Sequence, residues 1–307
     1  MKKVLFILLI AACTALPSRG YITQKKLQGT AIVQVKWPSS SLTWNLVPPQ
    51  AANITGSRTL STVANASFAT WDALTTATIT FTRGADTSPS ATYGYDNVNL
   101  VKTNLTSTEY ANSGAGDALA ITATSVALLT GDILDADIIF NPDVNVPFST
   151  DTATPSNQYD LESVLTHEVG HLLGLDHSAI LSATMFPRVG QGVTSSRVLS
   201  SDDIAGVSSL YPTASYQTKG SISGTVRLTS NASVYGAIVV AVNSNGQPAA
   251  HGVSDTKGNF TIYGLDPGGY TIYAEPMDAP FSFQDQGVLG EIFPGSTVST
   301  SFTTRFR

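Results

Sequence analysis

The sequence predicts an α+β domain followed by a small all-β sandwich, and two patterns lead to this fold class. Residues 31–211 mix alternating apolar segments with two helix-like stretches, which is typical of an α+β unit. From residue 221 onward, short runs of β-branched and aromatic residues recur between turn signals such as 243–246 and 266–269. Because the chain has 307 residues, each domain is long enough to bury its own core.

The elements of the first domain follow from the same patterns. Apolar residues at helical spacing predict a helix over residues 61–74. Ser156 and Asn157 offer an N-cap for a second helix, which we expect to begin near Gln158 and to have a broad apolar side. Strands are expected at residues 42–46, 78–82, 118–126 and 133–140.

The domain boundaries are expected where the composition changes. Residues 213–218 lack periodicity and are rich in small polar side chains, so they are interpreted as an unstructured linker. The expected division is an export signal at 1–20, the α+β domain at 21–212, the linker at 213–218 and the sandwich at 219–307.

The first twenty residues have the pattern of an export signal. Two lysines precede an apolar run of 13 residues, 4–16, which is too short to cross a bilayer as a helix. The only cysteine, Cys13, lies inside this run. It is either removed with a cleaved signal, giving a secreted protein, or it is the lipidated residue of a lipoprotein-like box and anchors the chain at the cell envelope.

The charge distribution excludes some classes of partner. Only 12% of the residues are charged, and the formal net charge is −6. No stripe rich in lysine and arginine is present, so the sequence has no electrostatic signature for nucleic acid or for an anionic membrane surface.

One short segment has the spacing of a metal site. His167 and His171 are four residues apart on the second helix, so both imidazoles can reach one ion. Gly174 can leave helical geometry and return the chain so that His177 supplies a third nitrogen. Three neutral nitrogens leave one position of a tetrahedral Zn²⁺ open, and Glu168 beside the first ligand can take a proton from water there.

Chance explains this pattern poorly. With 4 histidines in 307 residues, the combination would arise in about one of a million such chains on a simple frequency product. The remaining histidine, His251, stands alone in the second domain and is expected to be a solvated turn residue rather than a ligand.

On these residues the chain resembles the metzincin metallopeptidases and, among them, the matrixins, over about residues 36–211. The zinc motif is followed by Ser178, the residue that matrixins have there, and Met185 with Pro187 resembles their Met-turn beneath the zinc. Residues 199–211 are similar to their C-terminal helix. The resemblance implies a metzincin fold, with a twisted mixed sheet, an antiparallel edge strand and an active-site helix. It also implies that Asp202 or Asp203 bonds into the Met-turn.

The activity implied is zinc-dependent endoproteolysis. A protein or peptide substrate would pair in extended form with the edge strand at residues 118–126, and Glu168 would act as the general base. Ser163 corresponds to the wall of the pocket for the residue after the cleaved bond, which predicts a preference for medium to large apolar side chains. If Arg188 turns inward, that pocket could favour an acidic residue instead.

Two departures from vertebrate-type matrixins concern metal and latency. No cysteine follows Cys13 to block the zinc, and no histidine remains in the first domain for a second zinc, so one zinc per chain is expected. Calcium can be held by aspartate and backbone oxygens, for which Asp137, Asp143 and Asp151 are available.

The second domain resembles the carboxypeptidase-regulatory-like, transthyretin-type sandwich. It has no combination of acid, base and nucleophile, so it is interpreted as an accessory that contacts a cell surface or matrix, in a monomeric protein. A chain ending near Thr213 is therefore expected to stay folded and active.

Two alternative functions stay open at this point. One is a catalytically vestigial protein that retains zinc and acts through adhesion by the sandwich. The other is a zinc hydrolase of a non-peptide amide, which the metal ligands alone do not distinguish from a peptidase.

Overall fold

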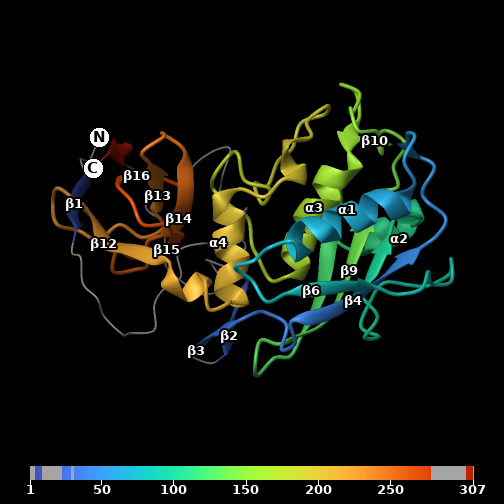
Figure 1. Cartoon of the computed structure of the whole chain (residues 1–307), viewed down its shortest axis with the longest axis horizontal. Helices are drawn as coiled ribbons and strands as arrows, with labels where there is room; N and C mark the ends of the chain where they lie inside the picture. Colours follow the sequence, from blue (N-terminus) through green and yellow to red (C-terminus); the bar gives the residue numbers. More distant parts are fainter. Residues whose placement is uncertain (1–3, 9–22, 29–30, 278–301, 307) are drawn as a thin grey trace.

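The computed structural model describes residues 4–8, 23–28, 31–277 and 302–306. Figure 1 shows two parts, an α+β part that contains the longer helices and a smaller part made of strands, with helix α4 (Ser201–Leu210) next to the second part. The predicted order of an α+β domain followed by an all-β domain is therefore confirmed. No helix in the described segments combines the length and the apolar character needed to cross a membrane.

The α+β domain is built on a five-stranded mixed sheet with the order β6-β4-β7-β9-β8. Strands β6, β4, β7 and β9 run parallel to one another. Strand β8 pairs antiparallel with β9 and forms one edge of the sheet. The predicted mixed sheet with an antiparallel edge strand is thus confirmed. The strands are β4 (Ser41–Val47), β6 (Thr80–Arg83), β7 (Leu100–Lys102), β8 (Ala120–Val126) and β9 (Ile133–Phe140).

Helices α1 (Leu60–Asp72) and α3 (Leu161–Leu172) cover one face of this sheet (Figure 1). Phe68 of α1 stacks on Trp44 of β4 with ring centroids 4.2 Å apart, and both side chains are buried. The indole N–H of Trp71 donates to the carbonyl of Thr166 at 2.9 Å, so α1 also fixes α3. A short helix, α2 (Ser107–Asn112), follows β7.

Helix α3 begins three residues later than the N-cap at Ser156 and Asn157 predicts. Its N-cap is Asp160, whose carboxylate accepts from the amide of Ser163 at 2.8 Å. Arg197 donates to the same carboxylate from Nε at 2.8 Å, which holds the cap in place. The preceding residues instead extend a small parallel sheet of β11 (Tyr159–Asp160), β10 (Phe148–Ser149) and β5 (Ile54–Thr55).

The second domain has two antiparallel sheets whose apolar inner faces meet, as a sandwich requires. One sheet has the order β1-β12-β15 and the other β14-β13-β16-β17. These strands are β1 (Val4–Leu8), β12 (Gly220–Leu228), β13 (Ile238–Asn243), β14 (Pro248–Val253), β15 (Asn259–Leu265), β16 (Tyr270–Glu275) and β17 (Arg305–Phe306).

The N-terminal segment is described only in part. Strand β1 comes from the predicted export signal and pairs with β12, whereas Cys13 lies outside the described residues. A hairpin of β2 (Lys25–Gln28) and β3 (Ala31–Gln34) follows. Just before it, the side-chain amide of Gln24 donates to the carbonyl of Leu175 at 3.2 Å.

The predicted linker is structured, contrary to the sequence-based expectation. It contains a 3-10 turn, η2 (Tyr216–Thr218), and the amide of Thr213 donates to the carbonyl of Thr76 at 3.1 Å. Ala205 of α4 is buried among the core residues of the sandwich. The two domains therefore share buried contacts. The expectation that a chain ending near Thr213 stays folded and active assumed that the domains share none.

Candidate metal centre

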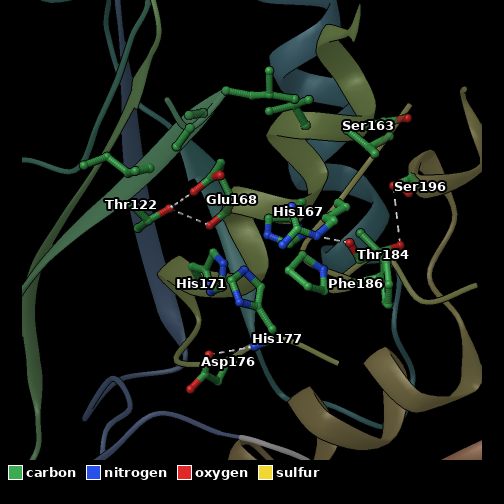
Figure 2. Close-up of a pocket in the computed structure, with 18 of the residues that line it drawn as sticks. Thr122, Ser163, His167, Glu168, His171, Asp176, His177, Thr184, Phe186 and Ser196 are labelled. Carbon is green, nitrogen blue, oxygen red and sulfur yellow. Dashed lines mark hydrogen bonds between the residues drawn. The ribbon is translucent and has the colours of Figure 1, made fainter. Parts of the chain in front are cut away.

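Three histidine side chains converge at the C-terminal half of α3. His167 and His171 lie one turn apart on this helix, and His177 reaches the same point from the segment that follows (Figure 2). One ring nitrogen from each histidine lies within 4.8 Å of the other two, close enough for a single ion to bind all three. Among the described residues, no other group of three or more His, Cys, Asp or Glu side chains is arranged in this way.

The return of the chain to His177 depends on Gly174. Helix α3 ends at Leu172, and Gly174 adopts a φ of +93°, a left-handed conformation that glycine adopts without a steric penalty. A β-carbon at this position would also meet the carbonyl of Val35. The amide of His177 then donates to Oδ1 of Asp176 at 2.8 Å, which orders the chain just before the third imidazole.

Backbone carbonyls fix the orientation of two imidazoles. Nδ1 of His167 lies 2.7 Å from the carbonyl of Thr184, and Nδ1 of His171 lies 2.9 Å from that of Leu175. Because a carbonyl only accepts, each Nδ1 carries the proton and each Nε2 keeps its lone pair for an ion. Burial and the nearby His177 lower the pKa of His167 to about 3, and burial with both neighbouring histidines lowers the pKa of His171.

Glu168 lies beside the histidines in the same cleft. Its side chain is buried, and burial raises the pKa of its carboxyl group to about 7. The hydroxyl of Thr122 on the edge strand β8 lies 2.7 Å from Oε2 of Glu168 and 3.0 Å from its carbonyl oxygen (Figure 2). This hydroxyl opposes the effect of burial on the pKa and ties the carboxylate to the sheet edge.

The segment around Met185 contacts the first histidine through the carbonyl of Thr184, which lies 2.7 Å from Nδ1 of His167. Asp203 accepts from the amides of Thr184 at 2.8 Å and Met185 at 3.0 Å, so this aspartate, rather than Asp202, bonds directly into the turn. Asp203 also caps α4 together with Ser200. Burial, with Asp202 nearby, raises the pKa of Asp203 to about 6.

Asp202 bonds instead to the residue after the third histidine and to the second domain. Its Oδ2 accepts from the hydroxyl of Ser178 at 2.6 Å, and its Oδ1 accepts from the amide of His251 at 2.9 Å. Nδ1 of His251 lies 2.9 Å from the same Oδ1. The expectation that His251 is a solvated turn residue is wrong, because it lies on strand β14 and is fully buried.

The cleft in front of the histidines has a volume of about 570 Å³. One side is formed by residues 118–122 at the start of the edge strand, and the opposite side by residues 186–189 after the Met185 turn. Ser163, Pro187 and Arg188 all line it, so the structure brings these predicted pocket residues to one place. Ser163 is 1% exposed, which puts its side chain in the depth of the wall rather than at the rim.

The aspartates considered for calcium do not come together around one point. Asp137 accepts from the amides of Gly94 at 2.6 Å and Leu100 at 2.9 Å. Asp143 accepts from the amide of Asn145, and Asp151 from that of Ser57. Each carboxylate therefore organises its own loop.

Thr122 and His251 are the contributors that sequence reasoning missed. Thr122 lies on a strand that was expected at the edge of the cleft. Because side chains alternate between the two faces of a strand, the pattern along β8 could have indicated which of them face the helix with the histidines. His251 gave no such signal, because it is 49 residues from Asp202 and stands in a different domain.

Comparison with known proteins places both parts of the chain. The sequence profile of the matrixin family matches residues 36–212, and that of the carboxypeptidase regulatory-like domain matches residues 221–277.

Individual relatives are similar over a short region. Metalloendoproteinase 5-MMP of Arabidopsis thaliana is 52% identical over 52 residues, 17% of this chain and 14% of the relative. Metalloendoproteinase 1 of Glycine max is 48% identical over 56 residues, 18% of each chain. Matrilysin of Homo sapiens is 48% identical over 46 residues, 15% of this chain and 17% of the relative. The chain thus covers less than a fifth of the length of these relatives.

Proposed function

The chain belongs to the matrixin family, and on that premise we propose that it is a secreted, zinc-dependent endopeptidase that cleaves internal bonds of extended polypeptides. The convergence of three imidazoles beside a buried glutamate, in a cleft bordered by an open strand edge, is the observation that carries the proposal.

The donor set fits Zn²⁺. His167, His171 and His177 offer three neutral nitrogens, which leaves one position of a tetrahedral ion for substrate or water. When bound there, zinc would supply a Lewis acid for the scissile carbonyl and for an attacking water. We propose one such ion per chain.

Glu168 is proposed as the general base. A pKa raised by burial to about 7 suits a group that must accept a proton from water near neutral pH and then release it. In this mechanism the carboxylate takes the proton of the attacking water and passes it to the amine that leaves. Thr122 holds the carboxylate toward the histidines while this occurs.

The substrate is proposed to bind along β8. Within the part of the chain that the structure describes, this strand pairs with β9 alone, so backbone groups on its other side can pair with an extended peptide. Such pairing holds the main chain without demanding a particular sequence. It also favours peptides over other amides.

The side chain after the cleaved bond is proposed to enter the pocket between Ser163 and the 186–189 segment. Apolar residues such as Leu, Met or Phe should be preferred there, each gaining up to about 1.5 to 3 kcal/mol on burial. Arg188 lines the same cleft and could instead attract an acidic side chain, so profiling of the cleavage sites decides between the two preferences. Asp or Glu directly after the cleaved bond in most peptides would contradict the apolar pocket.

Ser163→Arg tests the position of the pocket. It should narrow the range of side chains accepted after the cleaved bond if Ser163 forms the pocket wall.

Secretion, with Cys13 either removed or lipidated, is proposed from the leader pattern, and the protein is proposed to act as a monomer. Mass spectrometry of the exported chain distinguishes the two fates. A chain beginning near residue 21 indicates cleavage, whereas a lipid on Cys13 indicates an anchor.

The principal test replaces the proposed base. Glu168→Ala should keep the zinc and lose most of the activity, whereas His177→Ala should weaken zinc binding itself, because two ligands hold zinc poorly. Digestion of a peptide library, read by mass spectrometry, measures activity, and metal analysis measures bound zinc and any calcium. Parental cleavage rates in Glu168→Ala would remove Glu168 from this role, and two tightly bound zinc ions would contradict the single site.

A further inference from the structure

Strand β13 of the sandwich is buried on both faces. Side chains alternate along a strand, so Val239 and Ala241 point into the core of the sandwich, whereas Ile238 and Val240 point the other way. An outer face of an isolated sandwich would be solvated and polar. This outer face is apolar and covered.

The covering residues come from the segment that joins the metal site to its cleft. Residues 178–187 follow His177 directly and contain the Met185 turn. The side chains of this segment and of the sandwich form one buried apolar cluster. Its members include Ile180, Ala183 and Phe186 from the segment, with Ile238, Val240 and Met277 from the sandwich.

Phe186 links this cluster to the substrate cleft. It lines the cleft in front of the histidines (Figure 2). Yet it is only 8% exposed, and it packs in the cluster with the sandwich. One wall of the cleft is therefore backed by the second domain. A change behind Phe186 would alter the wall without touching any residue that faces the substrate.

A polar contact holds the other end of the same segment. His251 donates from its backbone amide to Asp202, and its Nδ1 lies within 3.0 Å of both carboxylate oxygens. Asp202 in turn accepts from Ser178, the neighbour of the third histidine. These three side chains are at most 3% exposed, so loss of one partner leaves a buried polar group unpaired.

We propose that the sandwich is a positioning domain for the metal site and for the pocket wall. His251, acting through Asp202 and Ser178, and the outer face of β13, acting through Phe186, hold residues 178–187 in place. The inference rests on the proposed peptidase function for its kinetic readout. Neither His251 nor β13 lines the cleft, so both act through the segment that they hold.

The first test changes the polar contact in the full-length chain. In His251→Ala, kcat/KM for a peptide should fall at least tenfold, and zinc should pass to a chelator at least fivefold faster. The visible spectrum of the Co²⁺-loaded protein should shift, because Asp202 loses the imidazole contact and holds Ser178, the neighbour of the third histidine, less firmly. His251→Asn keeps an N–H donor toward Asp202 and should restore part of each property.

The second test changes the apolar contact and has a matched control. Val240→Ala removes two methyl groups from the outer face of β13, whereas Val226→Ala makes the same change within the sandwich core. We expect Val240→Ala to raise KM several-fold for peptides with a large residue after the cleaved bond. Val226→Ala should lower stability and leave KM and kcat at the parental values.

The outcomes separate this inference from the proposed function. If no peptide is cleaved by the parental protein, the peptidase proposal fails, but zinc transfer and the Co²⁺ spectrum still test the positioning role. Folded His251→Ala and Val240→Ala proteins with parental zinc transfer, spectrum and kinetics would overturn the inference. Equal effects of Val240→Ala and Val226→Ala would also overturn it, because general loss of stability would then explain them.

Discussion

The hydroxyl of Thr122 joins the edge strand to the carboxylate of Glu168 at 2.7 Å. Thr122→Val keeps the shape of the side chain but removes the hydrogen bond, so the carboxylate loses the contact that aims it. A hydrogen bond to a charged group contributes about 1.5 to 3 kcal/mol, so we expect kcat/KM to fall at least about tenfold. Zinc content should not change. Thr122→Ser keeps the hydroxyl and should retain most activity, and a fully active valine variant would contradict the role.

The buried carboxyl group of Asp137 links stability to pH. Burial raises its pKa to about 7, against two backbone amides that favour the charged form. Between about pH 4 and pH 7 the folded state therefore binds more protons than the unfolded state, so this group lowers the free energy of unfolding as pH rises. For a shift from 3.8 to about 7, the loss is on the order of 4 kcal/mol.

The corresponding measurement compares Asp137→Asn, which cannot ionise, with the parent by urea unfolding from pH 4 to pH 8 in calcium-free buffer. The variant should gain stability relative to the parent as pH rises through this window. A constant difference across the window, or one that changes in the opposite direction, would show that Asp137 is ionised throughout.

Single residues also show which parts of the site were predictable. The three histidines and Glu168 lie within eleven residues, so helical spacing and one glycine turn suffice to bring them together. His251 could not be found in this way, because a lone histidine has no local pattern that distinguishes a solvated turn from a buried partner of Asp202.

Helix α3 packs against the Met185 turn at Gly170. A β-carbon added there would overlap Sδ of Met185 and would lie 3.0 Å from Trp71. Gly→Ala within a helix normally gains up to about 1 kcal/mol, but overpacking in a core costs about 1 to 3 kcal/mol. The contact is with side chains that are themselves buried, so we expect Gly170→Ala to be destabilising overall and to displace the Met185 turn.

A double-mutant cycle checks this cause. Met185→Ala removes the sulfur atom that the added β-carbon would meet, so the double variant should be less destabilised than the sum of the two single changes. Thermal or urea unfolding measures the three free-energy differences. Strict additivity would show that Gly170 matters for another reason than its contact with Met185.

Elements with clear periodicity were predicted, whereas the start of α3 and the short strand β7 were not. Helix α1 and strands β4, β8 and β9 match the expected segments closely. The start of α3 differs because a tertiary contact, Arg197 with Asp160, supports the cap. Strand β7 has three residues and lies inside the sheet, so it is too short to show a period.

At the scale of the whole molecule, the division into two domains was predictable from composition, but their contact was not. The interface is made of isolated positions such as Ala205, Ile180 and Val240, which lie far apart in sequence. In the sequence of its own strand, Val240 is one apolar residue among others. The neighbouring residues do not show that it packs against side chains of the first domain.

This interface predicts that the two domains unfold as one unit. Unfolding the sandwich alone would expose the outer face of β13 together with Ile180 and Phe186, and it would leave Asp202 without His251. The contacts that would be lost are those that hold the segment with Met185. The metal site should therefore unfold together with the sandwich. Calorimetry of the zinc-loaded full-length chain should give a single transition with equal calorimetric and van't Hoff enthalpies. Two separate transitions, with peptide cleavage surviving the first, would show that the first domain folds independently. A chain ending near Thr213 should then also be folded and active.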